Sequence, residues 1–377
     1  MALDLQSIRD ELDDIDKKIV DLFEDRMKLC ENVAQYKIEN NKKVLDKERE
    51  MQKINTVKSY AHNSFNENGV GELFSQIMSI SRKMQYQILG SHGIGNEPGF
   101  SQIDYIDKKN VTVVYQGVPG AYSNKAMCSY FGKDVDNINV KTFREAMEYI
   151  SSKKADYAVL PLENSTAGIV NDTYDLLLEF DNYIVDQTEI KVEHALLGLP
   201  DAEISDIEVV YSHPQGLMQC TRFLDEHKEW KQIAQANTAG SAKKVIEEGN
   251  KNQAAIASES AAEIYGLKIL RSNINDNDKN TTRFIIIGNK KVYRSDAGKI
   301  CVCFELPHES GSLYNMLSNF IYNGLNMTKI ESRPIAEKSW EYRFYVEFEG
   351  KLDDAAVKNA LRGIAEEANY MKIIGNY

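Results

Sequence analysis

The sequence predicts a multidomain protein: an all-α helical domain, then a two-lobed α/β domain, then an α+β ferredoxin-like domain. Three observations predict this order. Apolar residues recur at three- and four-residue steps over about the first ninety residues, as they do in amphipathic helices. Short apolar strands then alternate with helices from Val111 to about Gly288. The last eighty residues follow a β-α-β-β-α-β order.

Composition and charge narrow the class of protein. With 377 residues, 42% hydrophobic and 27% charged, the chain is long for a single core and ordinary for a soluble protein. The net charge of −12 argues against nucleic acid and anionic membranes as partners, because both would repel such a surface. We find no basic leader with an apolar run and no stretch of about 18 apolar residues, so we expect a cytoplasmic protein.

The five cysteines predict neither disulfides nor a metal site. Cys30, Cys128 and Cys220 are scattered singly, which is typical of a reducing compartment. Cys301 and Cys303 lie two apart in a predicted strand and therefore share one face. Because no second Cys or His cluster lies near them, core packing is the favoured interpretation.

The first ninety residues predict three helices. The first runs from Leu5 to about Glu39 and is about 50 Å long, too long to bury its apolar stripe against two shorter helices. A helical homodimer solves this problem, and the dimer could double into a tetramer. Asp46 is expected to cap a second helix that ends near Asn63, and a third helix is expected over Gly71 to Leu89.

Polar residues inside this helical pattern form a possible anion site. Arg26 and Lys37 are eleven residues apart, about three turns, so their side chains can converge on one small anion. Arg9 lies about 25 Å further back and turned to another side, so it could join only a partner's site. Further polar positions cluster at the start of the second helix and along the third, namely Asp46, Arg49, Glu50, Ser81 and Gln85. For any one of these residues taken alone, a solvated charge on a helix surface is the favoured interpretation.

As a set, these eight positions over residues 1–90 resemble the all-helical bacterial-type chorismate mutase domain. The resemblance implies that chorismate is rearranged to prephenate without a cofactor or metal. It implies Arg9 of a partner chain and Arg26 on the carboxylates, and Lys37 and Gln85 on the breaking ether oxygen. Arg49 and Glu50 would hold the remaining carboxylate and the ring hydroxyl.

A second polar region follows the stretch Tyr157 to Asp172. Tyr157 to Leu160 is expected to form a buried strand that Pro161 stops, with a helix resuming from Ile169. The turn between them carries four polar residues, Glu163, Asn164, Ser165 and Thr166. A strand, polar loop and helix in this order place donors at the carboxyl edge of a sheet, where open α/β folds bind ligands. Taken alone, the stretch is equally compatible with a capped turn.

Two further stretches carry polar groups at strand ends. Ser212 ends a strand and Gln219 lies one turn into the following helix. Thr281, Thr282 and Arg283 begin a strongly apolar strand that continues with Phe284. The glycines of residues 93–95 and 117–120 do not form a dinucleotide-binding loop, which argues against a dehydrogenase.

These stretches, with PLENSTAGIVND and GVPGAYS, resemble the prephenate dehydratase family over residues 110–290, after a linker at 91–109. The resemblance implies decarboxylation and dehydration of prephenate to phenylpyruvate, with Thr282 facing the leaving hydroxyl. The residue types suggest Arg283 as the carboxylate clamp and Glu163 as a competing acid if its pKa is raised. The expected substrate-positioning residues are Asn164, Ser165, Thr166, Ser212, Gln219 and Phe284.

Residues 298–377 resemble the ACT regulatory domain, which binds amino acids in biosynthetic enzymes. Phenylalanine-sensitive dehydratases keep the motif ESRP, here Glu331, Ser332, Arg333 and Pro334. Where relatives commonly read GALF, this chain has Gly311, Ser312, Leu313 and Tyr314. The resemblance implies L-phenylalanine as an effector that binds between chains and inhibits dehydration.

Together these resemblances predict a bifunctional enzyme of phenylalanine biosynthesis. The alternative hypothesis is a protein with the same folds but no catalytic activity, which senses an amino acid or another metabolite. A mutase fused to a prephenate dehydrogenase would need the nucleotide fingerprint that this sequence lacks.

Overall fold

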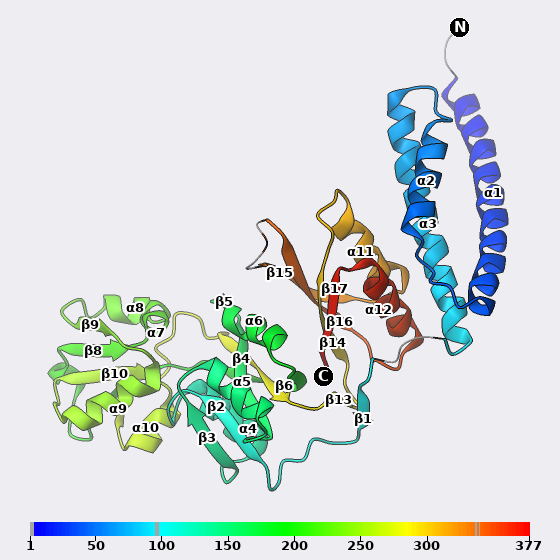
Figure 1. Cartoon of the computed structure of the whole chain (residues 1–377). Coiled ribbons are helices and arrows are strands. Elements are labelled where there is room, and N and C mark those ends of the chain that lie inside the picture. Colours follow the sequence, from blue (N-terminus) through cyan, green and yellow to red (C-terminus); the bar gives the residue numbers. More distant parts are fainter. Residues whose placement is uncertain (1–3, 95–97, 336–337, 339) are drawn as a thin grey trace. The chain divides into compact units, whose positions relative to one another are not determined.

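The computed structural model of the protein describes residues 4–94, 98–335, 338 and 340–377. It divides into two compact units (Figure 1). The first unit takes the chain up to Gly99 together with Gly298–Ile373, and the second takes Phe100–Ala297 with Ile374–Tyr377. The helical and the C-terminal regions therefore share one unit, although they lie at opposite ends of the sequence.

Three helices begin the first unit: α1 (Leu5–Glu39), α2 (Lys47–Lys58) and α3 (Ser64–Ser91). The bounds of α1 agree with the prediction, and Asp46 caps α2 as expected by accepting a bond of 3.0 Å from the Arg49 N–H. In the described part of the chain, no helix is both long enough and apolar enough to cross a membrane.

The other two helix bounds were predicted wrongly. α2 ends at Lys58, well before Asn63, and α3 begins at Ser64 instead of Gly71. The Asn63 side chain accepts a bond of 2.8 Å from the Asn66 N–H and so caps α3. Glycine inside a helix costs only about 1 kcal/mol, so a good cap and packing against the neighbouring helices offset the glycines of the first turns.

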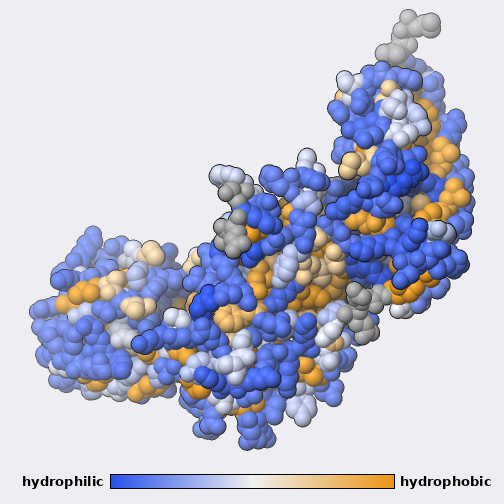
Figure 2. Space-filling view, in the orientation of Figure 1, coloured by the Kyte–Doolittle hydropathy of each residue, from blue (hydrophilic) through white to orange (hydrophobic). Residues whose placement is uncertain are grey.

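The apolar stripe of α1 is largely uncovered. Leu12 is 53% exposed and Leu22 is 69% exposed, while Ala34 is the buried residue of this helix. Figure 2 shows the apolar side chains gathered along the length of α1. The apolar face of an amphipathic helix normally packs against a hydrophobic core, and most of this face of α1 packs against nothing in the described part of the single chain.

Four neighbouring strands of a sheet, with two helices, make up the rest of the first unit, and the last of these strands runs past Ile373. These strands lie in the order β15, β16, β14, β17. The elements are β14 (Lys299–Glu305), α11 (Ser312–Tyr322), β15 (Met327–Pro334), β16 (Tyr342–Glu349), α12 (Ala355–Glu367) and β17 (Tyr370–Asn376). The β-α-β-β-α-β element order agrees with the prediction, and Cys301 and Cys303 are fully buried in β14, as packing residues should be. α11 and α12 both contact α3.

The strands of the second unit form two larger groups, in agreement with the two predicted lobes, and one separate two-stranded sheet. The first lobe has the strand order β6, β12, β4, β2, β3. Its elements are β2 (Thr112–Gln116), α4 (Tyr122–Phe131), β3 (Asp136–Val140), α5 (Phe143–Ser151), β4 (Tyr157–Asn164), β5 (Gly168–Ile169), α6 (Asn171–Glu179), β6 (Tyr183–Lys191) and β12 (Thr281–Gly288).

The second lobe has the strand order β11, β7, β10, β8, β9. Its elements are β7 (Ala195–Gly198), the 3-10 helix η1 (Ile204–Asp206), β8 (Val209–Ser212), α7 (Pro214–Met218), α8 (Thr221–Asp225), β9 (Lys231–Ala234), α9 (Thr238–Glu248), β10 (Gln253–Ala257), α10 (Glu259–Tyr265) and β11 (Lys268–Arg271). Buried alanines of β10 and α9 form much of its core, which lets the helix lie close to the sheet.

Two predictions about strands in this unit were wrong. β4 does not stop at Pro161 but continues to Asn164, because a register shift in its pairing with β12 accommodates the proline. The expected linker contains a strand, β1 (Ser101–Ile103), which pairs in parallel with β13 (Val292–Arg294).

Candidate active sites

A first cluster of predicted site residues lies among α1, α2 and α3. The Lys37 Nζ donates to Gln85 Oε1 at 3.0 Å and to the Val44 carbonyl at 2.6 Å. The Arg26 guanidinium donates to Ser81 Oγ at 2.6 Å. Two residues of α1 are thus each joined to a predicted partner on α3, with both cations facing the interior of the helical region.

The start of α2 adds negative charge beside this cluster. Burial lowers the pKa of the Lys37 amine, while the carboxylates of Asp46, Glu50 and Glu366 oppose this shift. Glu50 Oε2 accepts a bond of 2.5 Å from Arg82 of α3. The side chain of Arg49 is on the surface of the single chain.

Arg9 does not join the cluster within one chain. It is exposed near the start of α1, seventeen residues and about 25 Å before Arg26 along the helix axis. The arrangement agrees with the prediction that this arginine cannot serve the site of its own helix.

A second cluster of predicted residues lines two neighbouring cavities between the sheets of the second unit. The cavities measure about 470 and 320 Å³ and share Ala167, Gln215 and Gln219. Asn164 lies at the wall of the larger cavity and donates to Thr282 Oγ1 and to Asn280 Oδ1, both at 2.8 Å. Because Thr282 accepts the amide proton, its own O–H is available to donate to a ligand.

The loop after β4 is tied to this asparagine. The Oδ1 of Asn164 accepts bonds from the Thr166 hydroxyl at 2.7 Å and from the Ala167 N–H at 2.9 Å. The Thr166 hydroxyl also lies 2.9 Å from Asn280 Oδ1. Sequence reasoning missed Asn280, although it stands in the same DKNTTRF stretch as Thr282.

A buried histidine supports Gln219 from behind. His194 Nε2 lies 2.9 Å from Gln219 Oε1, and its Nδ1 lies 3.2 Å from the Tyr122 hydroxyl. Burial lowers the pKa of His194, against the bond to Gln219, so the ring is neutral at neutral pH. Sequence reasoning missed both residues: Tyr122 stands in the GVPGAYS stretch but was not singled out, and His194 belongs to none of the quoted motifs.

Two predicted residues lie away from the cavities. Arg283 donates to Glu163 Oε2 at 2.8 Å, and neither side chain lines either cavity, whereas Thr282 and Phe284 do. Successive residues of a strand point to opposite faces of a sheet, so Thr282 and Arg283 cannot face the same space. The Glu163 carboxylate and the Arg283 guanidinium occupy one another at 2.8 Å. The geometry therefore does not support Arg283 as the clamp or Glu163 as the acid.

Two of the other predicted positioning residues are structural in this arrangement. Ser212 is fully buried and donates to the Ile256 carbonyl at 2.8 Å. A Cβ on Gly216 would lie only 2.6 Å from Ser212 Oγ, so glycine is required where α7 passes over it. Ser165 exchanges hydrogen bonds with the Thr281 backbone and joins the loop to β12.

Helix N-termini face the larger cavity in place of cationic side chains. Among the residues that the structure describes, no Lys or Arg lines either cavity. Tyr122 and Ser123 line it at the start of α4, whose N-cap Ala121 provides no side-chain bond. Asn237 and Thr238 line it at the start of α9. The unpaired N–H groups and the helix dipole make such ends favourable for anions.

The predicted effector residues lie on two elements of the C-terminal sheet region. Gly311 is the N-cap of α11 with φ of 81°, a left-handed conformation that favours glycine, and Tyr314 in the first turn is 60% exposed. The residues of ESRP lie on β15, at the edge of the sheet: Glu331, Ser332, Arg333 and Pro334.

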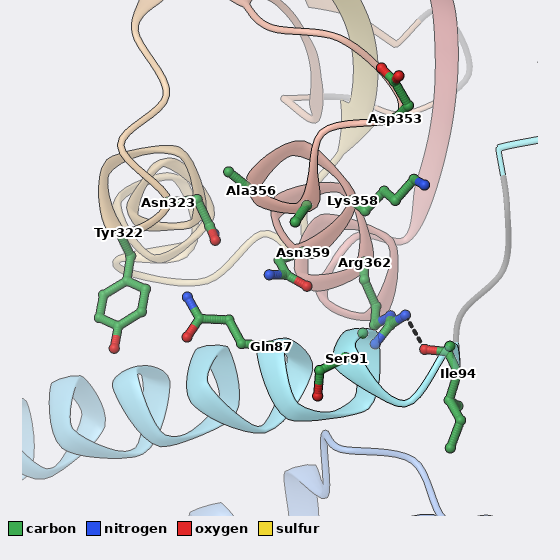
Figure 3. Close-up of a pocket in the computed structure, with 13 residues that line it drawn as sticks. Gln87, Ser91, Ile94, Tyr322, Asn323, Asp353, Ala356, Lys358, Asn359 and Arg362 are labelled. Carbon is green, nitrogen blue, oxygen red and sulfur yellow. Dashed lines mark hydrogen bonds between the residues drawn. The ribbon is translucent and has the colours of Figure 1, made fainter. Parts of the chain in front are cut away.

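A third cavity of about 650 Å³ lies within the first unit, between α3 and the helices α11 and α12 (Figure 3). Gln87 of α3, Asn323 after α11 and Asn359 of α12 are among its lining residues. At one end, Arg362 donates to the Ile94 carbonyl and, at 3.2 Å, to the Tyr86 carbonyl. None of the sequence-predicted site residues lines this cavity.

Comparisons with known proteins agree with this division of the chain. Residues 8–86 match the chorismate mutase type II family and residues 113–292 match the prephenate dehydratase family. A bifunctional chorismate mutase/prephenate dehydratase of Buchnera aphidicola is 32% identical over 99% of this chain and 96% of its own length. These matches define a multidomain biosynthetic enzyme.

Solved structures resemble the chain over about seven tenths of its length. A prephenate dehydratase of Arthrobacter aurescens, in complex with L-Phe, is 29% identical with a TM-score of 0.67, over 71% of this chain and 90% of that one. A protein described as a novel type of quorum quenching acylase is 31% identical with a TM-score of 0.65, over 70% of this chain and 96% of that one. The chain belongs to the family of bifunctional chorismate mutase/prephenate dehydratases.

Proposed function

We propose that the first unit rearranges chorismate to prephenate and that the second unit converts prephenate to phenylpyruvate. The observation that carries this proposal is the full-length similarity to bifunctional relatives. Within each of the two predicted clusters, polar side chains from different elements are hydrogen-bonded to one another. The substrates are small anions, and both clusters offer donors at spacings that fit one small molecule.

Mutase chemistry needs a folded substrate conformer and donors to the ether oxygen that breaks. Lys37 and Gln85 are already bonded to one another, so both side chains are oriented before the substrate arrives. Arg26 and the partner's copy of Arg9 bind the carboxylates, while Arg49 and Glu50 bind the remaining carboxylate and the ring hydroxyl. Because charge develops on the ether oxygen in the transition state, the Lys37 ammonium contributes most to the rate.

Dehydratase chemistry couples loss of the ring carboxylate to departure of the ring hydroxyl, and aromatisation drives it. Thr282, fixed by Asn164, donates its O–H to the departing hydroxyl. The N-termini of α4 and α9, rather than Arg283, meet the substrate carboxylates. Gln219, oriented by neutral His194, positions the ring.

The assembly is a homodimer through the exposed apolar face of α1, and further association could give a tetramer. The exposed stripe and the separation of Arg9 from Arg26 both support a shared site between two chains. L-phenylalanine acts as a feedback inhibitor at the C-terminal region, which functions as an ACT domain. The start of α11 and the edge strand β15 supply the binding groups. The enzyme works in the cytoplasm.

The test is to incubate the purified full chain with chorismate alone and to follow chorismate loss and phenylpyruvate formation, with and without phenylalanine. We expect both, and slower phenylpyruvate formation with phenylalanine present. Accumulation of prephenate alone would refute the dehydratase half. No chorismate loss would favour the silent sensor.

A second candidate activity, acyl cleavage, follows from the similarity to the protein described as a quorum quenching acylase. It would use the same cavities of the second unit. An acyl amide supplied in place of prephenate distinguishes the two, because acid and amine products form only if the acylase reading holds.

A further inference from the structure

The last turn of α12, from the C-terminal region of the sequence, lies directly behind the predicted mutase residues. Two adjacent carboxylates, Glu366 and Glu367, end this helix, and both contact α3 or the loop before α2. These contacts lie within one compact unit. Neither carboxylate was predicted from the sequence.

Glu367 reaches the site through Arg82. The Arg82 guanidinium donates to Glu50 Oε2 at 2.5 Å with one nitrogen and to Glu367 Oε1 at 3.0 Å with the other. Its side chain is only 10% exposed, and those of Glu50 and Glu367 are 22% and 13% exposed. Burial alone would lower the pKa of Arg82, but the two carboxylates hold the pKa above its usual value. A planar guanidinium held at both ends fixes the direction of the Glu50 carboxylate.

Glu366 reaches the site through the loop before α2. Its Oε2 accepts from the Leu45 N–H at 3.0 Å and from the Tyr86 hydroxyl at 2.8 Å. Leu45 directly follows Val44, whose carbonyl receives the Lys37 ammonium at 2.6 Å. One carboxylate oxygen therefore ties this loop to α3 beside Lys37.

We propose that Glu366 and Glu367 are positioning residues of the mutase site: Glu367 orients Glu50 through Arg82, and Glu366 holds the loop that binds Lys37. This inference rests on the proposed mutase function and deepens it. The C-terminal region is then a structural part of the mutase as well as a regulatory region, and any ligand that shifts α12 also changes chorismate turnover. Arg362 anchors the same face of α12 to α3 beside the third cavity (Figure 3).

The first test replaces Glu367 by alanine in the full chain. Alanine favours helix and removes a negative charge from a helix C-terminus, so α12 itself is not weakened. Glu50 binds a hydroxyl that is present throughout the reaction, so we expect KM for chorismate to rise roughly tenfold with kcat within about twofold. The matched control is Glu349→Ala, at an exposed position at the end of β16, which should change neither constant.

A double-mutant cycle separates positioning from general loosening. If Glu367 acts through Glu50, then Glu367→Ala should have no further effect on KM in a Glu50→Gln background. An equal further loss in that background would overturn the inference, as would a normal KM in the single variant. Absence of chorismate turnover in the unaltered protein would instead refute the proposed function.

The second test uses the charge of Glu366. Glu366→Gln keeps an acceptor for the Leu45 N–H but removes the carboxylate of one of the titratable groups facing the Lys37 amine. These groups are Asp46 before α2, Glu50 of α2, Glu366 of α12 and Cys30 of α1. Removing a nearby carboxylate lowers the pKa of an amine, so the basic limb of the kcat profile should move to lower pH. Glu349→Gln should leave the profile in place. An unmoved limb in Glu366→Gln would contradict the role of Glu366.

Discussion

Thr282 and Arg283 follow one another in β12 and point to opposite faces of its sheet. Thr282 lines the larger cavity of the second unit, whereas Arg283 is paired with Glu163 away from it. Arg283, which the sequence suggested as the clamp for a substrate carboxylate, is thus paired with the Glu163 carboxylate of its own chain. The hydroxyl next to it keeps a proton to donate, because Asn164 occupies its acceptor side.

At this scale we predict the result of Thr282→Val, which keeps the shape of the side chain and removes its hydroxyl. Loss of one donor to a developing negative charge should lower dehydratase kcat by about a hundredfold or more. Mutase activity should not change. The control is Thr281→Val, because the Thr281 hydroxyl lies next to the Lys279 carbonyl and Thr281 lines neither cavity. Equal losses in both variants would contradict the role of Thr282.

At the scale of elements, helix ends replace cationic side chains around the same cavity. The starts of α4 and α9 both line it, and α4 has no side-chain cap. A protein with a net charge of −12 can therefore bind a dianion without lysines or arginines among the described lining residues.

Thr238→Asp tests this binding mode. An aspartate in the first turn of α9 stabilises the helix but repels an anionic substrate, so KM for prephenate should rise roughly tenfold without loss of folding. Thr238→Asn has nearly the same shape without the charge and should leave KM close to that of the unaltered protein. If Asp and Asn act alike, shape rather than charge governs the effect.

A second element-scale prediction concerns the contact between α3 and α11. Lys83 of α3 donates to Ser318 Oγ at 2.6 Å, and burial lowers its pKa to about 8. Below that pH both folded and unfolded chains are protonated at Lys83. Between about 8 and about 10.4, the unfolded chain binds more protons, so folding gains stability as pH rises.

Melting temperatures of the unaltered protein and of Lys83→Met, measured across this pH range, test whether the Lys83 contribution to stability rises with pH. The difference should move in favour of the unaltered protein as pH rises from about 8 to about 10, and stay constant below pH 8. A difference that is flat across the whole range would show that Lys83 keeps an ordinary pKa.

At the scale of the whole molecule, α1 exposes an apolar face along its length (Figure 2). Arg9 lies far from Arg26 on the same helix. Both features have one explanation if two chains pack along α1 and each lends an arginine to the site of the other.

Complementation between two inactive variants tests this sharing. Arg9→Ala and Arg26→Ala should each lose mutase activity as homodimers. In a heterodimer of the two, one site combines an intact Arg26 with the partner's intact Arg9, so about half of the unaltered activity should return. A heterodimer as inactive as its parents would show that both arginines serve one chain.

Local patterns in the sequence predicted much of this fold. The bounds of α1 and the C-terminal element order follow from strong periodicity, and the Asp46 cap follows from its side chain. β4 passed through Pro161 against expectation, because the register shift that admits a proline depends on β12, more than a hundred residues away. The start of α3 was missed since the glycines outweighed the Asn63 cap in a local reading.

The candidate sites were predictable where a motif carried them and not where distant contacts did. Lys37 donates to Gln85, and Asn164 donates to Thr282, so the structure brings these motif residues together in pairs. Glu366 and Glu367 lie some three hundred residues from the loop and helix they contact, and no local pattern marks them. Strand alternation could have shown that Thr282 and Arg283 face different ways.

The most direct measurement follows chorismate in the unaltered protein, in Lys37→Met, in Thr282→Val, and in an equal mixture of the two variants. We predict phenylpyruvate from the unaltered protein, no chorismate loss with Lys37→Met, and accumulation of prephenate with Thr282→Val. The mixture should again form phenylpyruvate, because each variant supplies the step that the other lacks. Phenylpyruvate from Thr282→Val alone, or chorismate loss with Lys37→Met alone, would contradict two separate active sites on one chain.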